Sequence, residues 1–417
     1  MLDAVRAGAT FGDARDRALA GLAERDRRLA YELSAGVLRR RTALDRKLAL
    51  AHADPRLHDI LRLGLYQLRC LARVPAHAAV STSVELAREA AGEGAARYVN
   101  QALRKLTDVG SPPPPLVPGT GATHPAWLVR RWAARFGVEN TKRLVEWNDA
   151  KPPLILQPAR WDQHTIKDRL HAAGIGVTPA PFGAGLRLTP IPGTPTPRPA
   201  ELPGFAEGGF LVQDAAQALV VRYAAVPAGW WVYDACAAPG GKAVALARVG
   251  ARVVAGDARV ERLPRLIETA RRCGVAVRVL AADLLAAPFA PGSLPAVVVD
   301  APCTATGAMA RHPDARWRLR RGMIVRAAER QRRLLAAAAA LVAPGGVLVY
   351  ATCSLEPEEN TLVVDDLLQR HPEFRRAPPS SPTVVEDALF TSDGDLAVFP
   401  QRHGIDGAYA ARLVRSR

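Results

Sequence analysis

Cysteine is scarce in this chain, with five residues among 417. Their number is odd, and they lack the spacing of a metal-ligand set, which argues against both a disulfide framework and a metal site. No secretory leader pattern stands near the start, and the longest apolar run, LLAAAAALVA, is too short to span a bilayer. These absences predict a soluble cytoplasmic protein with reduced thiols, no bound metal and no membrane partner.

Acidic residues fall well short of basic ones, with 40 Asp and Glu against 56 Lys and Arg, for a net charge of +16. Nearly all of the positive charge is arginine, which a GC-rich genome explains. That bias explains arginine in place of lysine, but it does not explain the surplus of positive charge. The surplus favours a polyanionic partner, most simply nucleic acid.

The chain divides into four parts by pattern. Residues 1–109 repeat apolar side chains at intervals of three and four, which predicts an all-helical domain. Residues 110–125 read GSPPPPLVPGTGATHP and predict a linker. Residues 126–210 mix helices with short strands, as in a small α+β subdomain. From 211 to 417, apolar strands alternate with helices, which predicts a Rossmann-like α/β domain with a parallel sheet and an antiparallel edge at its end.

Polar residues follow successive strands of the predicted sheet. The first strand leads into DACAAPGGKA, where Gly240 and Gly241 permit close backbone approach to a ligand, and the next three strands end in Asp257, Asp283 and Asp300. Ligands bind at the carboxyl ends of such strands. Neither the G-x-G-x-x-G motif nor a P-loop is present, so we expect an adenosine ligand without a long phosphate chain. S-adenosylmethionine fits, with Asp257 on the ribose and Asp283 on adenine or a second ribose group.

Two cysteines stand just past two strand-like runs, in AVVVDAPC (Cys303) and GVLVYATC (Cys353). A thiolate at the end of a strand that faces a ligand crevice is a candidate covalent catalyst, and a second group close to it can assist. A cysteine is, however, more commonly a small buried hydrophobe. We interpret Cys273 in that way, as helix packing.

Three motifs carry a resemblance to a known class: DACAAPGGK (Asp234–Lys242), DAPCTATG (Asp300–Gly307) and YATCSLEPEEN (Tyr350–Asn360). Together they closely resemble the RNA cytosine-5 methyltransferases of the Nol/Nop/Sun class. The N-terminal part resembles a NusB-type RNA-binding domain through ERDRRLAYELSAGVLRRR, LGLYQL, VPAHAAV and VNQALRKL. A NusB-like domain joined to this core resembles the bacterial Sun family, whose members methylate small-subunit rRNA.

The resemblance implies roles for individual residues. Carbon 5 of cytosine is a poor nucleophile, but a thiolate added at carbon 6 makes it able to attack a methyl donor, and a second group near the adduct can then assist release. The resemblance assigns Cys353 as that nucleophile and Cys303 as the residue that aids product release, and it places Asp300 on the N3/N4 edge of the cytosine. Lys242 is expected to contact the cofactor or Asp300. The residues implied in S-adenosylmethionine binding are Cys236, Ala237, Ala238, Pro239, Gly240, Gly241, Lys242, Asp257, Arg262, Asp283 and Asp300.

Two motifs depart from the family pattern. TATG (304–307) stands where SGTG is commoner, and DGAY (406–409) stands where the family usually has DGFF. Neither departure touches a predicted catalytic position, so they bear on fine substrate contacts. A third feature is the stretch 310–333, which holds nine arginines. Such a run is commonly a solvated helix face, but beside the predicted site we interpret it as a phosphate-contacting lip.

The predicted substrate is a cytosine in 16S rRNA, in an unassembled or partly assembled small subunit, and the enzyme is expected to act as a monomer. The target base must be unstacked or flipped, which favours single-stranded RNA. Alternatives are a cytosine-5 methyltransferase of tRNA and a non-catalytic RNA-binding assembly factor. An enzyme that methylates amino groups would need an Asn/Asp-Pro-Pro-Tyr/Phe turn after the fourth strand, and DAPC is not one.

Overall fold

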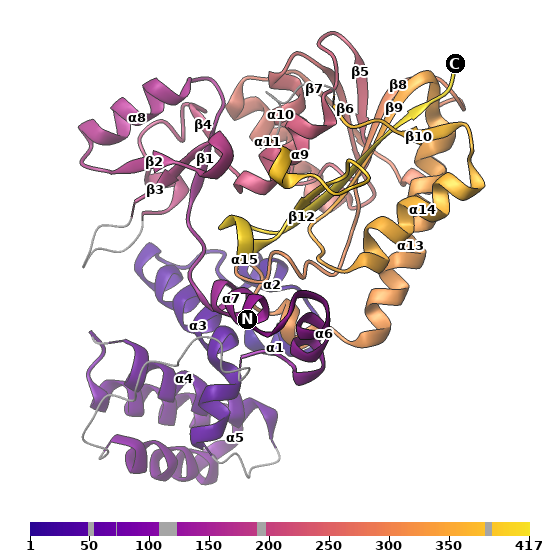
Figure 1. The fold of residues 1–417 in the computed structure, drawn as a ribbon. Helices are drawn as coiled ribbons and strands as arrows, with labels where there is room; N and C mark the ends of the chain where they lie inside the picture. The colour runs from indigo at the N-terminus through magenta and orange to yellow at the C-terminus, as the bar shows by residue number, and fades with distance from the viewer. Residues whose placement is uncertain (49–53, 72, 108–122, 190–196, 380–385) are drawn as a thin grey trace. The chain divides into compact units, whose positions relative to one another are not determined.

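The computed structural model describes residues 1–48, 54–71, 73–107, 123–189, 197–379 and 386–417 (Figure 1). Most of the predicted linker, at 110–122, lies outside the described residues. The chain forms two compact units. The N-terminal unit comprises Met1–Lys151 with Met309–Leu319, and the C-terminal unit comprises Pro152–Ala308 with Arg320–Arg417.

The N-terminal unit is helical throughout its described part. Its helices are α1 (Leu2–Arg6), α2 (Phe11–Ala18), α3 (Glu24–Leu48), α4 (Pro55–Cys70), α5 (Ala76–Thr107), α6 (Ala126–Phe136), α7 (Val138–Asp149) and α12 (Ala315–Arg318). Leu57, Leu61 and Leu65, four residues apart, place one apolar face of α4 against Val99 and Leu103 of α5. No helix in the described parts of the chain combines the length and apolar content needed to cross a membrane.

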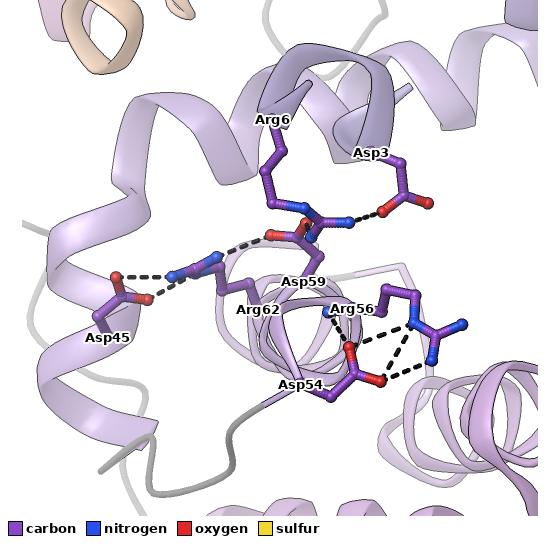
Figure 2. A network of polar contacts seen from close by, with 7 residues as sticks. All are labelled: Asp3, Arg6, Asp45, Asp54, Arg56, Asp59 and Arg62. Atoms are coloured by element: carbon purple, nitrogen blue, oxygen red, sulfur yellow. Dashed lines mark hydrogen bonds and ion pairs between the residues drawn. The ribbon is translucent and has the colours of Figure 1, made fainter. Parts of the chain in front are cut away.

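A buried arginine ties three of these helices together (Figure 2). Arg62 of α4 is 6% exposed and donates to Asp45 of α3 at 2.6 Å and to Asp59 of its own helix at 2.7 Å. Arg6 of α1 reaches the other oxygen of Asp59 at 2.7 Å. Two carboxylates therefore compensate one buried guanidinium, which burial alone would destabilise.

The segment 309–319 leaves the C-terminal unit and packs in the N-terminal one. Arg316 is fully buried there, 2.7 Å from Asp149 of α7 and 2.7 Å from the carbonyl oxygen of Asn148. Trp317 donates its indole N–H to the carbonyl of Leu38 at 2.6 Å. The interpretation of 310–333 as a phosphate-contacting lip is therefore wrong for Arg316, because its charge is enclosed and paired. These contacts also explain why α6 and α7, expected in the α+β subdomain, lie in the N-terminal unit.

The C-terminal unit begins with a small antiparallel sheet in the order β2-β3-β1-β4. Its elements are β1 (Ile155–Pro158), α8 (Gln163–Ala172), β2 (Val177–Pro179), β3 (Leu186–Leu188) and β4 (Phe210–Val212). Ile166 and Leu170, one turn apart on α8, pack with Leu156 and Phe210 of the sheet. This is the predicted α+β arrangement.

The second sheet follows the order β10-β12-β9-β8-β5-β6-β7, with β11 paired to β12. Its strands are β5 (Trp231–Asp234), β6 (Arg252–Asp257), β7 (Val277–Ala281), β8 (Leu294–Asp300), β9 (Val342–Thr352), β10 (Phe374–Arg376), β11 (Leu396–Val398) and β12 (Ala408–Arg415). The five strands β5 to β9 pair in parallel, whereas β12 runs antiparallel to β9, β10 and β11. The predicted parallel sheet and its antiparallel edge are confirmed.

Helices cover both faces of this sheet (Figure 1). They are α9 (Ala215–Ala224), α10 (Gly241–Arg248), α11 (Leu263–Cys273), α13 (Arg321–Leu341) and α14 (Thr361–Arg370), and a short helix, α15 (Pro400–His403), precedes β12. Val297 and Val299 pack towards α13 and α14, while Val298 packs towards α10 and α11. Two-sided burial explains why these strands are apolar without alternation.

The strand order reverses between β5 and β8. From β5 the chain adds β6 and β7 on one side, and then crosses to add β8 and β9 on the other. In an open parallel sheet, such a reversal is where ligands bind. Asp234 ends β5 and Asp300 ends β8, so this position brings two acids to one place.

Candidate active site

The turn from β5 into α10 is built on a glycine in the left-handed region. Gly240 has φ +105°, and a Cβ there would lie 3.1 Å from Cγ of Leu266. The turn is also tied to the next strand, because the Ala238 amide donates to Asp257 Oδ2 at 3.1 Å. The second Asp257 oxygen accepts from the Arg259 amide at 2.8 Å. The acid at the end of β6 thus holds the glycine turn in place.

Asp234, at the end of β5, was not singled out from the sequence as a binding residue. It is fully buried, and neither carboxylate oxygen has a well-aligned donor among the described residues, although the Cys236 amide lies close enough to lower its pKa. Burial and the nearby charge of Asp300 raise the pKa of Asp234 to about 7. Its position in the sequence could have identified it as a binding residue, since Asp234 ends its strand just as Asp257 and Asp300 end theirs.

Lys242 contacts Asp300, one of the two partners expected for it from the sequence. The Nζ atom lies 2.6 Å from Asp300 Oδ2, and the same ammonium group donates to Gln217 Oε1 of α9. Lys242 is 7% exposed, whereas the Asp300 side chain is 35% exposed. The pair fixes one Asp300 oxygen and leaves part of the carboxylate accessible. Gln217 was not anticipated, because its helix approaches only through the tertiary fold.

The remaining predicted cofactor residues line the same edge of the sheet. Asp283 is exposed after β7, and one of its oxygens accepts from the Leu285 amide at 3.0 Å. Arg262 is half-buried in the turn before α11. Tyr233 precedes Asp234 in β5. Burial raises the pKa of Tyr233, and so do the nearby charges of Cys236, Asp234, Asp257 and Asp283. The acids that end different strands therefore lie near one another.

The two predicted cysteines meet. Strands β8 and β9 are parallel neighbours, and Asp300 pairs with Ala351, so the residues that follow both strands emerge side by side. Cys303 Sγ and Cys353 Sγ lie 3.2 Å apart, and both residues are half-buried. The hydrogen bond with Cys353 and burial raise the pKa of the Cys303 thiol well above its usual value.

The other two cysteines of the C-terminal unit lie apart from this pair. Cys273 is buried in an apolar cluster with Val244 and Ala270, which fits the packing role inferred from the sequence. Cys236 sits in the β5–α10 turn, and burial, followed by the charges of Asp234 and Asp300, raises the pKa of its thiol. A thiol held neutral in this way is a poor nucleophile.

The cysteine-bearing loops contact the DGAY motif near the C-terminus. The Gly307 amide donates to the Cys353 carbonyl at 2.9 Å, and the Gly407 amide donates to the Gly307 carbonyl at 2.8 Å. A Cβ on Gly307 would lie 2.8 Å from the Gly407 Cα, so neither loop has room for a side chain there. Within TATG, Ala305 takes φ +55°, a left-handed conformation that glycine adopts at lower cost.

Comparison with known proteins identifies the family to which this chain is similar in each of its parts. Residues 225–414 match the family described as 16S rRNA methyltransferase RsmB/F, residues 3–108 match the NusB family, and residues 124–191 match the ferredoxin-like domain of RsmF/B-like methyltransferases. The chain is 33% identical to the probable ribosomal RNA small subunit methyltransferase B of Synechocystis sp., over 96% of this chain and 94% of the relative. It belongs to the ribosomal RNA small subunit methyltransferase B family.

A second relative supports this membership, and two solved structures share the fold. The ribosomal RNA small subunit methyltransferase B of Vibrio cholerae is 33% identical over 100% of this chain and 95% of its own length. The crystal structure of PH0851 superposes with a TM-score of 0.78 at 24% identity, covering 95% of this chain and 92% of that one. The structure of NSun6 from Pyrococcus horikoshii with SFG gives a TM-score of 0.60 at 19% identity, covering 70% and 98%.

Membership of the family confirms the coarser predictions. The fold is a Rossmann-like methyltransferase domain preceded by a small α+β subdomain and a NusB-like domain. The cofactor is S-adenosylmethionine, and the reaction is methyl transfer to 16S rRNA. The edge of the sheet suits this cofactor, because Asp234 presents buried carboxylate oxygens without well-aligned donors, to which a cationic amino group can bind.

Proposed function

We propose that this chain methylates carbon 5 of one cytosine in 16S rRNA through a covalent adduct with Cys353. The observation that carries the proposal is the 3.2 Å separation between the Cys353 and Cys303 sulfurs at the ends of neighbouring strands. A base at this edge of the sheet would meet both thiols. An enzyme that methylates an oxygen or an exocyclic nitrogen has no use for a paired thiol.

In the proposed reaction, the Cys353 thiolate forms a bond to carbon 6 as the C5=C6 double bond opens. The electron pair becomes available at carbon 5, which would take the methyl group as its bond to the sulfonium sulfur breaks and a neutral thioether leaves. Loss of the proton from carbon 5 restores the double bond and breaks the Sγ–C6 bond, so the thiolate is regenerated. Asp300 accepts from the N4 amino group, and its contact with Lys242 at 2.6 Å holds the carboxylate in place.

Cys303 suits the release step. Its raised pKa keeps it a neutral thiol at neutral pH, so it does not compete with Cys353 for carbon 6. It also lies within hydrogen-bond distance of the sulfur that must depart from the adduct. We assign it the role of assisting the elimination of Cys353 by hydrogen-bonding to the departing sulfur, while the proton from carbon 5 passes to solvent.

S-adenosylmethionine supplies the methyl group from a positively charged sulfonium. We assign Asp257 to the ribose hydroxyls and Asp283 to the adenine or a second ribose group. Asp234 would accept the amino group of the methionine end, and the β5–α10 turn would hold its carboxylate on backbone N–H groups. The remaining residues assigned to this site are Cys236, Ala237, Ala238, Pro239, Gly240, Gly241, Lys242, Arg262 and Asp300.

The RNA partner is proposed to be single-stranded 16S rRNA in an unassembled or partly assembled small subunit, bound by a monomer. The predicted division at 1–109, 110–125, 126–210 and 211–417 stays our proposal for the functional parts, with RNA affinity in the first. Arg326, Arg330 and Arg333 on α13 are exposed and remain candidates for phosphate contacts.

Bisulfite sequencing of total RNA from cells with and without the gene tests the proposal. One cytosine of 16S rRNA should resist conversion only when the gene is present. A protected cytosine in tRNA instead would favour the tRNA alternative. Full conversion of 16S rRNA in both strains would overturn the cytosine-5 assignment.

A further inference from the structure

A buried carboxylate contacts the residues that follow both cysteines. Glu359 is fully buried, and its Oε2 accepts from the Thr304 amide at 2.9 Å and from Gln331 Nε2 at 3.0 Å. Its Oε1 accepts from the Ser354 hydroxyl at 2.7 Å and from the Thr304 hydroxyl. Thr304 comes directly after one cysteine, and Ser354 comes directly after the other.

We propose that Glu359 is a positioning residue that holds Cys303 and Cys353 together against the target base. This inference rests on the proposed covalent mechanism, in which both sulfurs act on one cytosine. The two loops come from different strands, and β-sheet pairing extends only as far as Ala301, whose amide donates to the Ala351 carbonyl at 2.8 Å. Beyond that point, the Gly307 amide donates to the Cys353 carbonyl and the Leu355 amide to the Thr306 hydroxyl, and Glu359 adds the side-chain link between the residues next to the two cysteines.

Burial raises the pKa of the Glu359 carboxyl, whereas the hydrogen bonds from Ser354, Thr304 and Gln331 favour its ionised form. The Ser354 hydroxyl oxygen accepts from the Glu356 amide at 3.1 Å and lies 3.2 Å from the Thr306 hydroxyl, whose oxygen accepts from the Leu355 amide at 2.8 Å. The Ser354 hydroxyl also lies 3.4 Å from the Thr304 hydroxyl, and its shortest contact as a donor is the one to Glu359. Four donors thus meet the four lone-pair positions of a carboxylate. A protonated Glu359, or a glutamine in its place, would direct a hydrogen of its own at one of these four donors.

The same network reaches the residue before Cys303. Gln331 of α13 has two amide hydrogens, and its nitrogen lies within hydrogen-bond distance of both Glu359 and the Pro302 carbonyl, the latter at 2.9 Å. The DAPC loop is therefore held on both sides of its cysteine. Glu359 has no exposed surface, so it cannot contact RNA and acts only through Thr304, Ser354 and Gln331.

The first test measures the thiol pair directly with phenylarsine oxide, which condenses with two adjacent thiols and releases water. The wild-type protein should bind the arsenical at the pair, and a Cys303→Ser variant should lose that binding. Glu359→Gln should bind it about tenfold or more weakly, because the amide repels one of the donors and separates the loops. Glu358→Gln, at the neighbouring position, is the matched control and should match the wild type.

The second test follows the reaction with RNA that carries 5-fluorocytosine, which stops the reaction at the covalent adduct. Glu359→Gln should form the adduct about 10- to 100-fold more slowly, as a displaced reactive group does. Its Kd for S-adenosylmethionine should stay at the wild-type value, since the assigned cofactor residues other than Asp300 follow β5, β6 and β7, and its melting temperature reports whether the variant folds. Equal arsenical binding and an equal adduct rate in Glu359→Gln would overturn the proposal.

A milder variant keeps the proposal testable should Glu359→Gln fail to fold. Thr304→Val removes one hydroxyl donor and keeps the shape and the backbone hydrogen bond, so both readouts should fall several-fold, and unchanged values would count against the inference. Failure of the proposed function can be distinguished from failure of this inference. In that case the wild-type protein forms no RNA adduct, whereas the arsenical experiment still decides whether Glu359 sets the spacing of the thiols.

Discussion

Cys303 and Cys353 occupy nearly the same place but need not share a protonation state. The pKa of Cys303 lies well above its usual value, because it hydrogen-bonds to Cys353 and is buried. A neutral Cys303 thiol can donate a hydrogen bond to its neighbour and does not compete with it as a nucleophile. Residue-scale chemistry thus separates two side chains that look equivalent in the sequence.

The roles of the two cysteines can be separated by single substitutions. Cys353→Ala should bind cofactor and RNA but transfer no methyl group. Cys303→Ala should form the adduct and fail to resolve it, so a protein–RNA species should survive denaturing electrophoresis. The double variant should lose that species, because release matters only after attack. A trapped species in Cys353→Ala instead would reverse the two assignments.

Asp234 predicts a pH dependence with a definite sign. Its pKa in the folded, cofactor-free protein is about 7, above the ordinary value of 3.8, so the folded state binds its proton more tightly than the unfolded state does. Its contribution to stability is therefore greatest below about pH 4 and is lost as pH rises towards 7. Asp234→Asn should remove this loss.

The measurement is the melting temperature of wild type and Asp234→Asn at pH 5.5 and 7.5 without cofactor. The melting temperature of Asp234→Asn, relative to that of the wild type, should be higher at pH 7.5 than at pH 5.5. Asp257→Asn is the matched control, since that carboxylate has backbone donors on both oxygens. A wild-type and Asp234→Asn difference that is the same at both pH values would contradict the raised pKa.

Ala305 predicts a stabilising substitution. Its φ of +55° is left-handed, a conformation that costs an L-residue roughly 1–2 kcal/mol and glycine very little. Ala305→Gly should therefore raise stability by up to about 1 kcal/mol, reduced by the larger entropy of glycine in the unfolded chain. Chemical denaturation measures it, and Ala308→Gly in the same loop serves as the comparison. A destabilised Ala305→Gly would show that the alanine methyl group has a packing role.

At the scale of elements, a buried ion pair holds α12 in place among the helices of the N-terminal unit. Arg316 on α12 has no exposed surface, and its guanidinium bonds Asp149 at the end of α7. Burial raises the pKa of Asp149 despite this pairing, so the carboxylate depends on the arginine for its charge. The segment that follows the DAPC loop is thus fixed by a buried ion pair.

Arg316→Ala should destabilise the N-terminal unit by about 3–5 kcal/mol, because it leaves the buried Asp149 carboxylate uncompensated. Thermal or urea unfolding would measure the change. Arg143→Ala is a matched control, since Arg143 on α7 pairs with Glu139 at the surface and should contribute little. A stable Arg316→Ala protein would mean that Asp149 takes up a proton at little cost.

At the scale of the whole molecule, the chain passes between its two units more than once. It enters the C-terminal unit at Pro152, returns to the N-terminal unit over Met309–Leu319, and continues from Arg320 to the end. Trp317 and Ala310 in the returning segment bond Leu38 and Arg39 of α3. The predicted RNA-binding domain and the loop after Cys303 are therefore connected through one short segment.

Removal of residues 1–109 tests this connection. The truncated protein should keep its Kd for S-adenosylmethionine, because the cofactor residues all lie in the C-terminal unit. It should bind 16S rRNA more weakly, and methylation should fall further than RNA affinity does, because Trp317 loses its partner on α3. Calorimetry, gel-shift and methyl-transfer assays give the three values. Unchanged rRNA affinity and target choice would refute the role of this domain.

The sequence by itself determined the type of each element and the chemistry at the strand ends. Apolar runs predicted the parallel strands, and the position of Cys303 and Cys353 after two of them predicted that the thiols would meet, because neighbouring parallel strands end at one edge. The glycine turn followed in the same way. Local pattern suffices where a residue's place follows from the period of its own strand.

Only the tertiary structure decided which side chains from distant segments share a site. Asp234 looked like part of a turn until its burial without well-aligned donors appeared, and Glu359 looked like one more acid in LEPEEN. Arg316 looked like part of a basic surface and proved to be enclosed. Burial and pairing depend on residues more than a hundred positions away, such as Asp149 for Arg316, and no local period encodes such contacts.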